Sequence, residues 1–194
     1  MSGFFAMNNP PTPKPSLPHG ETDPNQLYNA VGRAIHAWEN METALARLYA
    51  TMTGLPENPV ALADYGSENR RFVDRLSALS DAAAAYFIGS PDQHREGELS
   101  GLLKDAKDLS IKRHRVAHGF VTMWTEFPIP PDAKGAIELQ AKVLFRWGAP
   151  FYSMTNLRTD PVGGDAASIE AVQKEFEDLH NRIAKFISEL PKRP

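Results

Sequence analysis

The side chains best suited to chemistry lie together in the segment KRHRVAHGF, residues 112–120. Arg113 carries a guanidinium, a group that can hold phosphate oxygens through two parallel hydrogen bonds. His114 and His118 are four residues apart and therefore share one face of a helix. An imidazole can accept or donate a proton near neutral pH. These three groups are the minimum set for cleaving a phosphodiester without a metal ion.

The same segment also has a purely structural interpretation. Lys112, Arg113 and Arg115 lie in the last turns of a predicted helix, where a cation stabilises the helix dipole by a few tenths to about 1 kcal/mol. Gly119 is a common residue at a helix end, and His118 could bond the last carbonyl groups. Taken alone, the segment is compatible with both interpretations.

A second polar group lies on the predicted first helix, where Trp38 is followed by Glu39 and Glu42. The two carboxylates are three residues apart and share a helix face. They could pair with Arg113 or Arg115 across a helical bundle, or they could face solvent. Trp38 could stack on a nucleobase, although packing in the core is the commoner role of a tryptophan.

The sequence RHRVAH (residues 113–118) resembles the R-x4-H motif of the HEPN superfamily, and the Trp38, Glu39 and Glu42 pattern resembles one seen in some small bacterial members. The resemblance implies a helical domain that pairs two-fold, with the motif helices facing each other. Many HEPN domains are metal-independent endoribonucleases of toxin–antitoxin, phage-defence or RNA-processing systems. Others are inactive and bind RNA, nucleotides or partner proteins.

By position, the resemblance implies that Arg113 holds the scissile phosphate and that His118 acts as general base or acid. His114 would orient one of them, while Lys112 and Arg115 would contact the substrate. The supporting residues on the first helix would be Trp38, Glu39 and Glu42.

The expected function is therefore a metal-independent endoribonuclease that works as a homodimer without a cofactor or metal, on RNA, with an antitoxin or other protein as a second partner. The alternative is a catalytically inactive helical module for dimerisation or for binding RNA or a partner.

The charge distribution restricts the kind of nucleic-acid contact. The net charge is −3, which argues against duplex binding through a global basic field. Between residues 104 and 115, however, five cations stand against two carboxylates. This local excess suits a phosphate pocket better than a broad binding track.

The composition excludes other classes of site. The chain has no cysteine, so disulfides and thiolate metal sites are absent. His114 and His118 could form half of a zinc site, but the H-E-x-x-H pattern and a clear third ligand are missing. No apolar run approaches the roughly 20 residues of a membrane helix, and no signal peptide is recognisable. We therefore expect a cytoplasmic protein that does not contact a membrane.

Helix signals divide the chain into a leader and one domain. Five prolines between Pro10 and Pro18 predict a flexible leader over residues 1–22. Asp23 and Pro24 predict the start of a first helix that ends at Gly54. A second helix is predicted from Ser67 to Gly89. A third is predicted to follow a cap at Ser90, with Pro91 as its first residue, and to end at Gly119. A last helix is predicted between a cap at Asp165 and Pro191.

Between the last two helices the sequence becomes rich in β-branched and aromatic residues. The segments GFVTMWTEF, AIELQAKVLFRW and FYSMTNLRTD predict a small antiparallel meander over about residues 120–160. The predicted fold is mainly α, an antiparallel bundle of about four long helices with this β meander inserted before the last helix. It forms a single HEPN-like domain over residues 23–190, followed by a tail over residues 191–194.

Overall fold

The computed structural model describes residues 20–54, 63, 65–66, 71–126, 142–148 and 164–191. Several predictions fall outside these ranges. They concern most of the leader (residues 1–19), the third segment of the meander (residues 151–160) and most of the tail (residues 192–194). The second helix begins at Phe72 and not at Ser67, because its N-cap, Arg71, has an extended backbone that a continuous helix does not allow.

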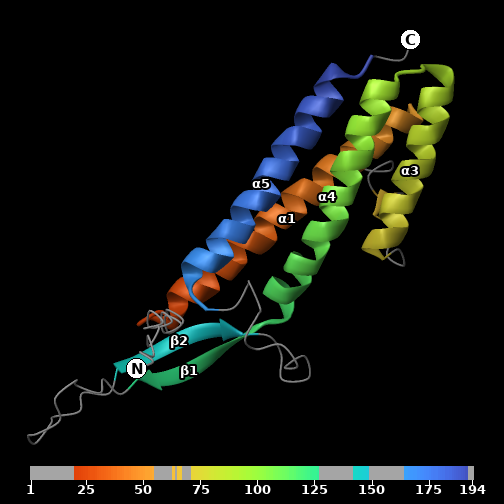
Figure 1. Cartoon of the computed structure of the whole chain (residues 1–194). Helices are drawn as coiled ribbons and strands as arrows, with labels where there is room; N and C mark the ends of the chain where they lie inside the picture. Colours follow the sequence, from red (N-terminus) through yellow and green to blue (C-terminus); the bar gives the residue numbers. More distant parts are fainter. Residues whose placement is uncertain are drawn as a thin grey trace, which may run out of the picture.

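Four long helices form a bundle, as the sequence predicts. They are α1 (Pro24–Thr53), α3 (Phe72–Gly89), α4 (Gln93–His118) and α5 (Ala166–Glu189). Figure 1 shows α1 running behind α5 and crossing behind α4, with α3 beside α4 and a two-stranded sheet at the end of the bundle where α4 ends. The sheet is inserted before the last helix, so the predicted mainly α architecture is confirmed.

Local capping explains where α1 and α5 begin and where α1 ends. The Asp23 carboxylate accepts a hydrogen bond from the backbone of Asn25 at 2.9 Å, and Pro24 is the first helical residue. Asp165 caps α5 by accepting from the backbone of Ser168 at 2.9 Å. Gly54 ends α1 with a φ of 70°, the left-handed conformation that glycine adopts without strain. These three predictions are confirmed.

The start of α4 differs from the prediction. Asp92, and not Ser90, is the N-cap, because its carboxylate accepts from the backbone N–H of Arg95 at 3.1 Å. The first helical residue is therefore Gln93, and Pro91 lies before the helix. A charged carboxylate stabilises the exposed N–H groups of a first turn through the helix dipole as well as through the hydrogen bond.

The core lies where α1 meets the other helices. Trp38 on α1 is 1 % exposed, and its ring contacts Phe72 of α3 and Phe176 of α5, with centroids 4.9 and 5.3 Å apart. The apolar face of α5 is buried throughout. It comprises Ile169, Val172, Phe176, Leu179, Ile183, Phe186 and Leu190.

The sheet consists of β1 (Phe120–Glu126) and β2 (Lys142–Gly148), paired antiparallel with Phe120 opposite Gly148. Glu21 pairs with Phe145 on the other edge of β2 through two backbone hydrogen bonds of 2.8 and 2.7 Å. The Glu21 carboxylate also accepts from the backbone N–H of Ala166 at 2.9 Å. Residues 20–22, which the sequence assigns to the leader, are thus tied to the sheet and to the start of α5.

Gly119 ends α4 as predicted, but for a different physical reason. Its φ of −74° is available to any residue, so the left-handed conformation of a usual glycine stop is not used. A Cβ on this residue would lie 2.1 Å from Nε1 of Trp147 on β2. Glycine is required here because the indole packs directly against the backbone. The residue after His118 is therefore fixed to the sheet.

Candidate functional site

The two histidines of the segment lie against each other at the end of α4. The ring centroids of His114 and His118 are 4.4 Å apart, with an angle of 50° between the ring planes, and both residues are exposed. The helical spacing of four residues brings them together, as expected. Two exposed imidazoles in contact can exchange protons with a solvent-borne substrate.

Arg113 lies beside this pair and lines a cavity between α1, α3 and α4. The cavity has a volume of about 470 Å³, and His114 is also part of its wall. Arg113 is partly buried, and its Nε has no hydrogen-bond partner among the described residues. Arg113 and His114 therefore line the same cavity, and His118 is linked to it through its ring contact with His114.

The opposite wall of the cavity is built from a chain of hydrogen bonds. The Trp38 indole donates to Oε1 of Glu42 at 2.8 Å, and Oε2 of Glu42 lies 2.6 Å from Nη2 of Arg75 on α3. Glu42 and Arg75 side chains are 20 % and 17 % exposed, so this ion pair is shielded from solvent. The Arg75 guanidinium also lies over the ring of Phe72, 5.8 Å from its centroid.

Sequence reasoning missed Arg75. The sequence left open whether Glu42 pairs with Arg113 or Arg115 or faces solvent, and the structure pairs it with Arg75. The two partners are 33 residues apart and on different helices, so no local spacing links them. The available signal was indirect, because a carboxylate beside a buried tryptophan requires a cation from some neighbouring helix.

The remaining predicted residues lie away from the cavity. Lys112 forms an ion pair with Glu175 of α5, with Nζ 2.7 Å from Oε1. Glu39 is exposed, and its backbone carbonyl accepts from the Thr43 hydroxyl. Arg115 is partly buried and is not among the residues that line the cavity. Of the eight predicted site residues, four therefore line the cavity (Trp38, Glu42, Arg113 and His114), and His118 contacts His114.

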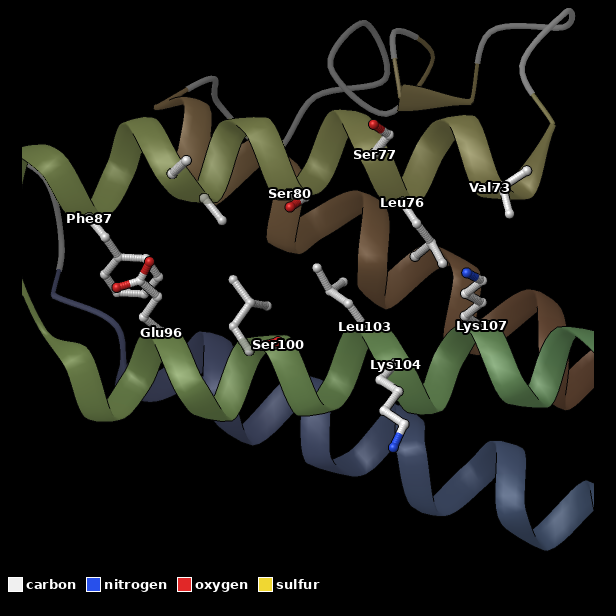
Figure 2. A pocket seen from close by; sticks show the side chains of 13 residues that line it. Val73, Leu76, Ser77, Ser80, Phe87, Glu96, Ser100, Leu103, Lys104 and Lys107 are labelled. Atoms are coloured by element: carbon white, nitrogen blue, oxygen red, sulfur yellow. The ribbon is translucent and has the colours of Figure 1, made fainter.

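A groove of about 690 Å³ runs between α3 and α4 and shares Val73 with the cavity. Figure 2 shows Phe87 and Leu103 pointing into this groove, with Lys107 extending from α4 toward α3 and Lys104 extending away from α3. The floor is apolar and cations lie toward one end. The groove and the cavity follow one another along the contact between α3 and α4.

Tyr65 belongs to the environment of the ion pair. It is 2 % exposed, its ring lies 5.5 Å from that of Tyr49, and its hydroxyl has no hydrogen-bond partner among the described residues. Burial raises the pKa of Tyr65 above its ordinary value, the positive charge of Arg75 opposes this effect, and the negative charge of Glu42 adds to it. Tyr65 therefore stays neutral near the ion pair of Glu42 and Arg75.

The described part of the chain also bears on other classes of function. No group of three or more potential metal ligands is close enough to hold an ion among the described residues. No helix in the described ranges is both long and apolar enough to pass through a lipid bilayer.

Comparison of the chain with family models, with curated proteins and with solved structures finds no match. The geometry must therefore carry the functional argument. It provides a guanidinium for an anion, a pair of exposed imidazoles for proton transfer, and a cavity of the size that small ligands occupy, about 300–1,000 Å³.

Proposed function

We propose that the protein is an HEPN-like, metal-independent endoribonuclease that acts as a homodimer, as a component of a toxin–antitoxin or phage-defence system. The observation that carries the proposal is the convergence of Arg113 and His114 on one cavity, with the His118 ring 4.4 Å from that of His114. A bare R-x4-H string does not require this convergence, because residues five apart lie on different faces of a helix.

In the proposed reaction, Arg113 binds the oxygens of the scissile phosphate and stabilises the charge that develops on them. His118 removes the proton from the ribose 2′-hydroxyl, and that oxygen attacks phosphorus. The bond from phosphorus to the 5′-oxygen breaks, and this oxygen takes a proton from a second imidazole. The products are a cyclic 2′,3′-phosphate and a free 5′-hydroxyl. His114 keeps the His118 ring in position through their contact.

The test is cleavage of bulk RNA by the purified full chain in the presence of a metal chelator. We expect Arg113→Ala and His118→Ala to lower the rate at least about a hundredfold, since acid–base catalysis contributes about 10²–10⁴-fold. His94→Ala is the matched control, because His94 is an exposed histidine near the other end of α4. The proposal is wrong if the folded wild-type protein leaves RNA intact and is harmless when expressed in a cell.

A second function, a catalytically inactive module that binds RNA or a partner protein, is favoured by one observation. Val73 and Ile111, at the same cavity, are 46 % and 57 % exposed. Exposed apolar side chains beside a cavity are typical of contact surfaces. Under this alternative, Ile111→Ser would weaken partner or RNA binding, and no variant would affect a cleavage rate because the wild type has none.

A further inference from the structure

The cavity between α1, α3 and α4 has an imbalance of charge. Among the described residues that line it, two guanidinium groups, those of Arg75 and Arg113, face one carboxylate, that of Glu42. Glu42 is committed on both oxygens, one to the Trp38 indole and the other to Arg75. Arg113 is left with a buried Nε that has no acceptor among the described residues.

This imbalance has a physical consequence. A cation that is partly removed from water loses hydration energy and is stabilised when an anion takes its place. The Ser110 hydroxyl does not supply the missing acceptor in its present position, since it donates to the carbonyl of Lys107. The empty part of the cavity is thus complementary to an anionic group that can accept hydrogen bonds from guanidinium.

The other walls indicate what the anion is attached to. Phe72 and the exposed side chains of Val73 and Ile111 form apolar surfaces beside the two arginines. A volume of about 470 Å³ lies within the range occupied by small organic ligands. A phosphate on the arginines with a nucleobase against the apolar wall would use both kinds of surface.

We propose that Arg75 is a second phosphate-binding residue of this cavity, and that Glu42 occupies its guanidinium until a nucleotide phosphate displaces it. The inference rests on the proposed ribonuclease for its ligand class, a nucleotide unit of single-stranded RNA. Glu42 is an internal competitor because a carboxylate, like a phosphate, is negatively charged and presents two acceptor oxygens to a guanidinium. Trp38 holds Glu42 in this position through its indole N–H.

A purely structural ion pair makes a different prediction. If Arg75 and Glu42 only join α1 to α3, then removing the carboxylate lowers the stability of the bundle and leaves phosphate affinity unchanged. If Glu42 competes with phosphate, its neutralisation tightens phosphate binding. Glu42→Gln separates the two cases, because glutamine keeps an oxygen that accepts from Trp38 and removes only the charge.

The experiment is a titration of adenosine 3′-monophosphate into the full chain at low ionic strength, followed by calorimetry. Glu42→Gln is expected to bind about tenfold more tightly than wild type, and Arg75→Gln about tenfold more weakly, which is the size of one charge-assisted hydrogen bond. Glu170→Gln is the matched control. It removes the carboxylate of an exposed ion pair with Arg33, outside the cavity, and should leave the affinity unchanged.

The double variant Glu42→Gln with Arg75→Gln completes the design. A competitor has nothing to compete for once Arg75 is gone, so the double variant should bind like Arg75→Gln alone. Inorganic phosphate should compete with the nucleotide, and adenosine without phosphate should bind at least about tenfold more weakly. If Arg75→Gln fails to fold, Glu42→Gln still decides the question.

Unchanged or weaker nucleotide binding by folded Glu42→Gln, or absence of binding by the wild type, overturns the inference. Failure of the ribonuclease has a different signature. Nucleotide binding with the expected order of variants and no RNA cleavage would refute the enzyme and keep the phosphate site. RNA cleavage that is insensitive to Arg75→Gln and Glu42→Gln would refute the phosphate site and keep the enzyme.

Discussion

At the scale of single residues, the site depends on which polar groups are satisfied inside the bundle and which are not. Glu42 has a partner on each oxygen, whereas the Nε of Arg113 and the hydroxyl of Tyr65 have none among the described residues. Hydrogen-bonded groups hold the walls of the cavity in place, because breaking such a bond leaves a buried polar atom without a partner and lowers the stability of the fold. The Nε of Arg113 and the hydroxyl of Tyr65 are themselves buried, so each lowers the stability of the fold by lacking a partner.

Tyr65 gives a residue-scale prediction with a defined pH dependence. Burial raises the pKa of Tyr65 in the folded state, so the unfolded chain loses its proton first as pH rises. The folded state then binds more protons than the unfolded state, and stability falls as pH rises past about 10, the ordinary tyrosine value. We expect wild type to lose more unfolding free energy than Tyr65→Phe between pH 8 and about 11.

The measurement is chemical unfolding of both proteins across this alkaline range. At pH 7 the Phe variant should be more stable by about 1 kcal/mol, because it removes a buried hydroxyl without a partner. Tyr28→Phe is a suitable control, since Tyr28 is 56 % exposed. Parallel pH profiles for wild type and Tyr65→Phe would contradict the proposed burial of the phenol.

At the scale of elements, the end of α4 is positioned by the sheet. Trp147 of β2 packs against Gly119, the residue that follows His118, and it leaves no space for a Cβ. The sheet is in turn held by Glu21 before α1 and by Gly164 before α5, which pair with β2. The β insertion therefore fixes the orientation of the helix end that carries the histidine pair.

Gly119→Ala is the element-scale prediction. The new methyl group would overlap the rigid indole of Trp147, so either the sheet or the end of α4 must move. We expect a loss of about 1–3 kcal/mol in unfolding free energy, the usual effect of overpacking. Shifted NMR signals of the His118 ring would report the displaced helix end.

Gly101→Ala is the matched control for this substitution. Gly101 is an exposed glycine inside the same helix, and a Cβ there meets nothing within 4 Å. Alanine is the better helix former by about 1 kcal/mol, so this variant should be more stable than wild type. Equal effects of the two substitutions would show that the contact with Trp147 does not constrain Gly119.

The contrast between these glycines shows what the sequence could reveal. The caps at Asp23 and Asp165 and the stop at Gly54 follow from local signals, and all three are confirmed. The position of Gly119 was also predictable, but its cause was not. The indole that excludes a side chain comes from a strand about 28 residues further along the chain, beyond the reach of local pattern.

At the scale of the whole molecule, charges are sorted between the two sides of α4. On the α5 side, a cavity of about 330 Å³ is lined by four carboxylates and two cations, namely Asp105, Asp108, Glu175, Asp178, Lys112 and Arg182. On the α3 side, the groove and the cavity that holds Arg113 carry more cations than carboxylates. A net acidic chain can therefore still accept an anionic strand on one side.

The sequence indicated the excess of cations on α4 but could not assign its members to sides. Lys112 is next to Arg113 in the chain, yet it faces α5 and pairs with Glu175. Neighbouring residues of a helix point about 100° apart, so which of them reaches a site depends on where the other helices pack. Helix packing also determines the ion-pair partners, Arg75 for Glu42 and Glu175 for Lys112, and no local sequence motif indicates them.

The last prediction concerns the assembly. In a two-fold dimer of the proposed enzyme, a site can take Arg113 from one chain and the catalytic His118 from its partner. Arg113→Ala and His118→Ala are each inactive in that case, but a mixed dimer contains one site in which both residues are intact. Random mixing makes about half of the dimers mixed, each with one of two sites working, so roughly a quarter of wild-type cleavage should return.

The measurement is RNA cleavage after the two variants are unfolded together and refolded, compared with each variant treated alone. His94→Ala mixed with His118→Ala serves as a control. The His94→Ala chain retains both Arg113 and His118, so about half of the sites should work whether they are shared between chains or not. No recovery in the Arg113→Ala and His118→Ala mixture, with about half of wild-type cleavage in that control, would mean that each chain builds its site alone. The exposed His118 ring would then have to reach the phosphate bound to Arg113 of the same chain, with the His114 ring beside it. A His114→Ala variant would in that case change the rate of RNA cleavage, because the His118 ring would lose the contact that positions it.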